Sequence, residues 1–287
     1  MNFLKKIFGT STEASQTPEE KEAENRKNFD ILKYDGVRAM KTQRFDYALE
    51  CFRHALELND DLEIHDYQYQ VYMALGDLAK AYGELEKLAE AQPDNIDIFL
   101  RMAHVAYMME DYVVMGTACE KALLIDKDSP LGLYLYAKAC IGTDDVTNAV
   151  AMLTRAILVK PDYADAYLLR GEVLLKDGKT DEAYEDVKQL LKSFSDNEDV
   201  LMLKANVEIA RGNIAETLKS LDMVIASNPF RVEAYKLRGE LRRQQGDEAG
   251  AKDDLLYAAE LEGQQMAGQQ ENIEEKTKEQ YAQTGLV

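Results

Sequence analysis

The residues of this chain that could do chemistry are three histidines, three cysteines and 53 acidic residues. Only Cys51 and His54 have the spacing of two metal ligands on one helix face. The other histidines, His65 and His104, fall on different segments, and a structural zinc site needs four ligands. A packed or solvated pair is therefore favoured over a metal centre, and we expect no metal site.

The sequence contains no motif that is typical of a catalytic or nucleotide-binding site. None of the patterns G-x-x-x-x-G-K-[ST], G-x-G-x-x-G and G-x-S-x-G occurs. The carboxylates scatter along segments with helical periodicity, where solubility explains them. We therefore expect a chain that is not an enzyme and that carries no cofactor.

Charge and cysteine usage limit the possible partners and the compartment. The formal net charge of −19 opposes binding to nucleic acids. It could favour a basic partner, although a solvated acidic outer face is the simpler interpretation. The chain has an odd number of cysteines, and no two of them form a C-x-x-C pair: Cys51, Cys119 and Cys140. This pattern is typical of small buried side chains in a reducing compartment. The apolar run near the N-terminus is too short for a signal peptide or a membrane span, so we expect a cytoplasmic location.

The elements that would position any site follow a repeat. Small residues recur every 34 positions at Ala137, Gly171, Ala205 and Gly239. Three other series keep this spacing or twice this spacing: Ala149, Ala183 and Ala251; Gly178, Gly212 and Gly246; Pro93, Pro161 and Pro229. A period of about 34 residues is diagnostic of a helix–turn–helix repeat.

The stretch Tyr163–Val187 contains both halves of one such unit. An apolar helical face surrounds Gly171, and a second one begins at Ala183, after a turn at Gly178. Two amphipathic helices joined by a tight turn form an αα-hairpin, and small residues at Gly171 and Ala183 are expected to let the two helices approach closely. Because one hairpin cannot bury both of its faces, stability should come from stacking against neighbouring hairpins.

This stretch resembles a tetratricopeptide repeat, through the small residue Gly171, the turn residue Gly178, the alanine at Ala183 and the proline Pro161. The resemblance covers roughly residues 29–265. It implies an all-α fold: an α-α superhelix, or right-handed solenoid, of about seven helix–turn–helix repeats. The second unit departs from the pattern because Tyr69 occupies the small-residue site, so a wider helix pair is expected there.

The pattern divides the chain into three parts. Residues 1–16 are expected to be a flexible segment, residues 17–265 the repeat array, and residues 266–287 a C-terminal capping helix and tail. Within these parts, Thr17-Pro18-Glu19-Glu20 predicts the start of the first helix, and Gln264–Gln270 is expected to be a polar linker before a helix over Glu271–Gln283.

Both ends leave an alternative open. Phe3, Leu4, Ile7 and Phe8, helped by Lys5 and Lys6, could contact a membrane surface or a partner, although a loose terminus is favoured. The segment from Ile273 to Val287 could fold back and occupy the groove described next.

The resemblance implies that the first helices of the pairs line a concave groove that accepts a peptide or a helix of another protein. Positions three before and four after each small residue give an apolar stripe, and the position one after gives a polar line. The predicted groove residues are Leu100, His104, Tyr107, Tyr134, Lys138, Ile141, Leu168, Glu172, Leu175, Met202, Asn206 and Ile209. Alternatively, the leucines and isoleucines only pack between neighbouring first helices, whereas the tyrosine hydroxyls need water or a partner.

Two functions of different classes fit these residues. The leading hypothesis is a non-enzymatic adaptor that binds a peptide or helix of a partner protein in the apolar groove. The alternative is a structural or self-associating subunit that uses convex faces or the ends of the array, and the oligomeric state is left open. Tetratricopeptide co-chaperones grip a C-terminal carboxylate with lysine and asparagine, but here Val37 stands at the asparagine position beside Lys33, and Asp66 adds negative charge, so that role is disfavoured.

Overall fold

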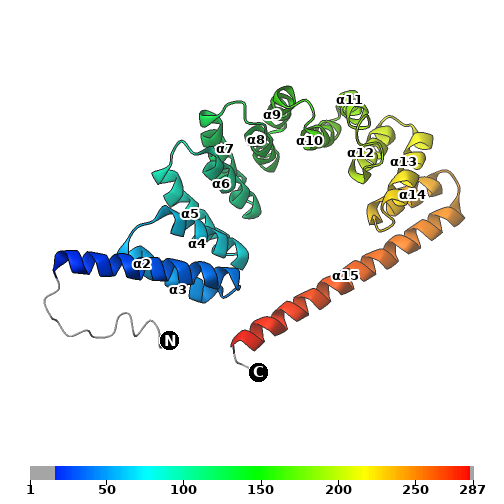
Figure 1. Ribbon diagram of the computed structural model, residues 1–287. Coiled ribbons are helices and arrows are strands. Elements are labelled where there is room, and N and C mark those ends of the chain that lie inside the picture. The colour runs from blue at the N-terminus through cyan, green and yellow to red at the C-terminus, as the bar shows by residue number, and fades with distance from the viewer. Residues whose placement is uncertain (1–16, 285–287) are drawn as a thin grey trace. The chain divides into compact units, whose positions relative to one another are not determined.

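The computed structural model describes residues 17–284, and in that range the chain consists of fourteen α-helices without a strand (Figure 1). The chain divides into two compact units, Met1–Val159 and Lys160–Val287. The flexible segment predicted over residues 1–16 lies outside the described residues. The predicted all-α helical-repeat fold is confirmed, whereas the handedness of the superhelix and the three predicted part boundaries stay predictions.

The first unit contains four helical pairs. They are α2 (Pro18–Lys41) with α3 (Phe45–Leu58), α4 (Leu62–Leu75) with α5 (Leu78–Ala91), α6 (Ile96–Met108) with α7 (Tyr112–Ile125), and α8 (Pro130–Gly142) with α9 (Val146–Val159). Two apolar clusters pack helices α2 to α8 against one another. One is centred on Phe52 and Leu32, and the other joins Leu85 of α5 to Met115 of α7 and Leu135 of α8. The core is therefore built mainly from contacts between consecutive helices, as expected for stacked hairpins.

The second unit contains three helical pairs. They are α10 (Ala164–Lys176) with α11 (Thr180–Leu190), α12 (Glu198–Ala210) with α13 (Ile214–Ser227), and α14 (Val232–Gln244) with α15 (Glu248–Thr284). Leu201, Leu221 and Leu241 belong to one buried cluster that runs from α12 through α13 to α14. The same alternation of first and second helices therefore builds both units.

The turn inside each pair explains the glycine series. Gly178 and Gly212 have φ of +78° and +77°, in the left-handed region that favours glycine. Gln43, Glu110 and Asp144 hold the equivalent positions in the first unit, with φ of +57° or +58°. The conformation repeats even where the residue type does not, and the sequence pattern is weaker in these repeats for that reason.

The small residue of α10, Gly171, makes room for a side chain of the next repeat. A Cβ atom on Gly171 would lie 2.7 Å from Cδ2 of Leu203 in α12, whereas the Asp186 Cβ of α11 would be at an ordinary 3.6 Å. The sequence predicted a close approach of α10 and α11 at Gly171, and for this glycine that stays a prediction. At the equivalent Gly239 the close neighbours do come from the same hairpin, since a Cβ atom there would lie 3.2 Å from the Ala251 carbonyl oxygen of α15. The wider helix pair expected at Tyr69 stays a prediction.

The prediction for the start of the array is confirmed, and the prediction for its end is wrong. Thr17 and Glu20 form the predicted capping box, in which the Glu20 N–H donates to Thr17 Oγ1 and the Thr17 N–H donates to Glu20 Oε2. The polar linker predicted over Gln264–Gln270 was wrong, because α15 continues through it without a break. Glutamine, alanine and methionine favour helix, and the glycine there, Gly268, costs only about 1 kcal/mol in a helix, as does Gly263 just before it.

Candidate functional site

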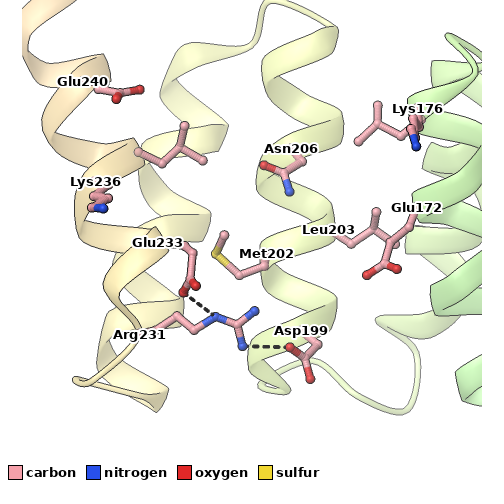
Figure 2. A pocket seen from close by; sticks show the side chains of 12 residues that line it. Glu172, Lys176, Asp199, Met202, Leu203, Asn206, Arg231, Glu233, Lys236 and Glu240 are labelled. Atoms are coloured by element: carbon pink, nitrogen blue, oxygen red, sulfur yellow. Dashed lines mark hydrogen bonds and ion pairs between the residues drawn. The ribbon is translucent and has the colours of Figure 1, made fainter. Parts of the chain in front are cut away.

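A cavity of about 650 Å³ opens between the three first helices of the second unit, α10, α12 and α14 (Figure 2). Its lining comprises Glu172, Leu175, Lys176, Asp199, Met202, Leu203, Asn206, Arg231, Glu233, Lys236, Leu237 and Glu240. In Figure 2, Asn206 projects from the middle helix, between Glu172 of α10 and Lys236 of α14. We call this cavity the first-helix pocket.

The period of the sequence brings these side chains together. Glu172, Asn206 and Glu240 each follow the small residue of their own helix by one position. Met202 and Lys236 each precede it by three. Since successive first helices stack in the same register, equivalent positions converge on one surface.

The floor of the first-helix pocket is apolar and held in place by the core. Leu203 is almost fully buried, at 1 % exposure, and Met202 belongs to the buried cluster of α12, α13 and α14, against which Leu237 packs. Leu175 adds an apolar side chain from α10. An apolar surface backed by a packed core is a suitable anchor for an apolar side chain of a ligand.

One wall of the pocket carries a cluster of charges around Arg231. The Arg231 Nη1 donates a hydrogen bond to Asp199 Oδ1 at 2.9 Å. Its Nε lies 3.2 Å from Glu233 Oε2 and forms an ion pair with it, but not a hydrogen bond. Burial acts to lower the pKa of Arg231, but the bond to Asp199 and the nearby carboxylates together raise it above its usual value. The guanidinium is therefore already balanced by carboxylates of the protein.

The opposite wall carries a carboxylate in a less favourable environment. The pKa of Glu172 is raised above its usual value, chiefly because neighbouring protein removes water from the carboxyl group, and secondly because of the Asp199 charge. Arg231 opposes this shift. Glu172 would therefore gain from a ligand that donates a hydrogen bond or brings a positive charge.

Three of the predicted groove residues of the first unit, Tyr107, Tyr134 and Lys138, form a separate cluster on α6 and α8. The Lys138 ammonium lies 3.6 Å from the ring centre of Tyr107 and 6.0 Å from that of Tyr134. Tyr107 is 37 % exposed, and its ring also meets Tyr112 edge to face. The lysine thus covers aromatic surface that the sequence predicted to be open to a ligand.

Comparisons with known proteins decide the family. Models of the tetratricopeptide repeat match residues 137–198 and 174–241. A solved tetratricopeptide repeat protein from Parabacteroides merdae aligns with a TM-score of 0.65 and 15 % identity, over 82 % of this chain and 93 % of that chain. The chain is a tetratricopeptide repeat protein.

The other matches include two longer proteins and a further solved structure. The chain is 28 % identical to human DnaJ homolog subfamily C member 3 over 219 residues, which cover 71 % of this chain and 37 % of that protein. Mouse tetratricopeptide repeat protein 16 is 22 % identical, over 79 % of this chain and 32 % of that protein. The chain thus spans about a third of the length of these relatives. The structure titled YrrB, a TPR protein with an unusual peptide-binding site, aligns with a TM-score of 0.52 and 15 % identity, over 63 % of this chain and 94 % of that chain, which shows a shared fold.

The tetratricopeptide architecture brings some of the predicted groove residues together and leaves others apart. Glu172, Leu175, Met202 and Asn206 line the first-helix pocket. Leu168 and Ile209 are half-buried outside its lining, and Ile209 packs against the core cluster. In the first unit, Leu100 and Tyr134 pack against the core, Ile141 is half-buried, and His104 is exposed.

Several pocket residues escaped the sequence interpretation. Leu203 and Leu237 precede the small residue by two positions, and Asp199 and Glu233 precede it by six. The 34-residue spacing of each couple is a signal that could have found them. Arg231 lies just before α14, so no helical register pointed to it.

The residues first considered for chemistry have structural roles in the tetratricopeptide pairs. All three cysteines are buried, as predicted, and burial raises the pKa of Cys51 above its usual value and that of Cys119 to about 12. Both are therefore held as neutral thiols. His54 Nδ1 lies 3.1 Å from Glu57 Oε2, and His65 lies between Glu84 and Asp60. The described residues contain no group of three metal-ligating side chains, and none of the helices from α2 to α15 is long and apolar enough to cross a membrane.

Proposed function

We propose that this tetratricopeptide protein is a non-enzymatic, cytoplasmic adaptor that holds a peptide or helix of a partner protein in the first-helix pocket. The fold is that of a protein-interaction module in general. The observation that carries the finer proposal is the convergence of three successive first helices on one cavity with an apolar floor and polar walls.

The floor would supply affinity and the walls would fix the register. An apolar side chain placed on Met202 and Leu203 would leave water, a transfer that contributes about 1.5–3 kcal/mol for a fully buried leucine-sized group. Asn206 stands at the centre of the pocket and offers both a hydrogen-bond donor and an acceptor. A donor and an acceptor together can bind a peptide group of a bound segment, which offers one of each.

The cluster on α6 and α8 is proposed as a separate contact region for a partner, within the first unit. Tyr107, Tyr134 and Lys138 present aromatic rings and a cation. Leu100, His104 and Ile141 are the other predicted groove residues on these two helices. In the second unit, Leu168 and Ile209 lie outside the lining of the first-helix pocket, and Ile209 packs against the core, so neither is assigned a contact with the partner there.

The proposal is tested by filling the pocket without disturbing the core. Asn206 is exposed, so Asn206→Arg should leave the helical content unchanged while its side chain blocks the floor. The matched control is Ala226→Arg, at an exposed position of α13 away from the pocket. Tagged wild-type and variant proteins are expressed in the native cell, and the captured proteins are identified by mass spectrometry.

We expect the partner to be captured by the wild type and by Ala226→Arg, and to be lost at least tenfold with Asn206→Arg. Equal capture by all three proteins would contradict the proposed site. A purified protein that releases a cofactor or metal on unfolding would contradict the non-enzymatic assignment.

A further inference from the structure

A second apolar trough lies on a different layer of helices, in the first unit. It has a volume of about 970 Å³ and is bordered by the second helices α5 and α7, with α6 at its base. Phe99, which is 5 % exposed, forms part of the floor, and Leu124 and Ile125 at the end of α7 form one wall. Leu124 is 86 % exposed, the highest value among the exposed large apolar side chains of the described residues. Folding of this unit therefore leaves a large apolar side chain beside an open trough.

The opposite rim of the trough is acidic. Glu86 and Glu90 are one helical turn apart on α5, and Asp94 follows the helix. Like charges at this spacing repel each other, and the nearby lysines of α5 are engaged by other carboxylates. The cation in the lining is Lys121, whose ammonium lies 5.8 Å from the ring centre of Phe99.

We propose that this trough docks a segment of a partner protein in which apolar residues are flanked by lysine or arginine. The apolar side chains would cover Leu124 and Ile125 and reach toward Phe99. The cations would pair with Glu86 and Glu90 and relieve their repulsion. A second copy of this chain is a poor occupant, because a net charge of −19 makes copies repel one another.

The docking surface is distinct from the first-helix pocket, since its residues come from α5, α6, α7 and the loop between α5 and α6. An adaptor with two surfaces of this kind can hold two segments at once. The inference does not depend on the pocket in the second unit, and the two are tested by different variants.

The repeat supplies a matched control for the test. Leu158, at the end of α9, stands 34 positions after Leu124, is 75 % exposed and lies outside the trough. Full-length wild type, Leu124→Glu and Leu158→Glu are each immobilised and used to select from one phage-displayed library of random twelve-residue peptides. Circular dichroism checks that all three keep the same helical content.

We expect the selected peptides to carry apolar residues next to lysine or arginine. They should bind the wild type and Leu158→Glu equally well, and Leu124→Glu at least tenfold more weakly. Carbodiimide should couple the lysines of these peptides to Glu86 or Glu90. Selection with the double variant Glu86→Lys and Glu90→Lys should instead enrich peptides with aspartate or glutamate.

Three outcomes would overturn the proposal. One is the absence of any peptide that distinguishes Leu124→Glu from Leu158→Glu. Another is a set of selected peptides that lacks basic residues, or whose composition stays the same when the double variant Glu86→Lys and Glu90→Lys is used. A third is a concentration-dependent mass in light scattering that Leu124→Glu abolishes, which would assign the trough to contacts between copies.

Discussion

The buried ion pairs are the residue-scale feature that most clearly ties a hairpin together. Arg170 binds Asp186 through two hydrogen bonds between α10 and α11, and Arg238 binds Asp254 in the same way between α14 and α15. The two pairs are 68 positions apart, or two repeats. Burial raises the pKa of Asp186 even though Arg170 acts to lower it. Such a pair costs much to bury, so it stabilises the hairpin only while both partners are present.

Asp254→Ala should therefore destabilise the second unit strongly. The carboxylate is 4 % exposed and also accepts a hydrogen bond from Arg242 at 2.8 Å, so its loss leaves guanidinium groups poorly balanced in a buried site. We expect a loss of about 3 kcal/mol in the free energy of unfolding, measured by urea denaturation. The control is Asp222→Ala, which removes an exposed carboxylate from the same Arg238 and should cost about 0.5 kcal/mol. Equal losses for the two variants would show that burial does not decide the effect.

The raised pKa of Glu172 should make the free energy of unfolding depend on pH. Its pKa in the folded state is raised by removal of water and by Asp199, so the folded protein binds the proton more tightly than the unfolded chain. The contribution of this group is therefore favourable below its unfolded pKa of about 4.3 and is lost as the pH rises through the folded value. Glu172→Gln should raise the unfolding midpoint slightly at neutral pH. The gain should vanish at about pH 3.5, whereas a gain that is equal at both pH values would contradict this cause.

At the scale of the helix, the glycines show which close contacts the fold requires. A Cβ atom on Gly36 would lie 2.5 Å from Cε1 of Phe52, a ring that is fully buried between α2 and α3. A Cβ atom on Gly83 would have nothing within 4 Å. Both glycines lie inside helices, so they differ mainly in the space beside them.

Gly36→Ala and Gly83→Ala should therefore shift stability in opposite directions. Displacing the Phe52 ring should cost about 1–3 kcal/mol, whereas the gain in helix propensity is about 0.5–1 kcal/mol, so the expected net change is a loss. Gly83→Ala should keep that gain and stabilise the first unit. Thermal unfolding measures both, and a stabilised Gly36→Ala would show that Phe52 can move without cost.

The helical elements are also the part of the account that the sequence predicts best. The 34-residue period locates the pairs because a stack of equivalent hairpins must keep the same small and turn positions. It is weaker in the first unit, where Gln43, Glu110 and Asp144 adopt the left-handed turn without glycine. The break at Gln264–Gln270 was wrong because the end of a repeat pattern does not end a helix when the local residues favour one.

The pocket is less accessible to sequence reasoning for a physical reason. Leu203 looks like a core residue from its pattern, and it is one, yet its side chain also forms the pocket floor between two helices. The carboxylates that surround Arg231 come from α12 and from the start of α14, so their grouping depends on how adjacent repeats pack. Period alone predicts which positions are equivalent, but not which ones meet.

At the scale of the whole molecule, the adaptor account favours a protein that does not associate with itself. The net charge of −19 makes copies repel, and this repulsion weakens as salt is added. We expect light scattering to give the monomer mass from low to high protein concentration at about 0.15 M salt. A mass that rises with concentration would favour the alternative of a self-associating subunit.

Hydrogen exchange of the chain with and without its captured partner tests the central claim most directly. The account predicts slower amide exchange upon binding in α10, α12 and α14, the helices that line the first-helix pocket, and no such protection in Asn206→Arg. Protection confined to the second helices α11 and α13, with the three first helices unchanged, would contradict it.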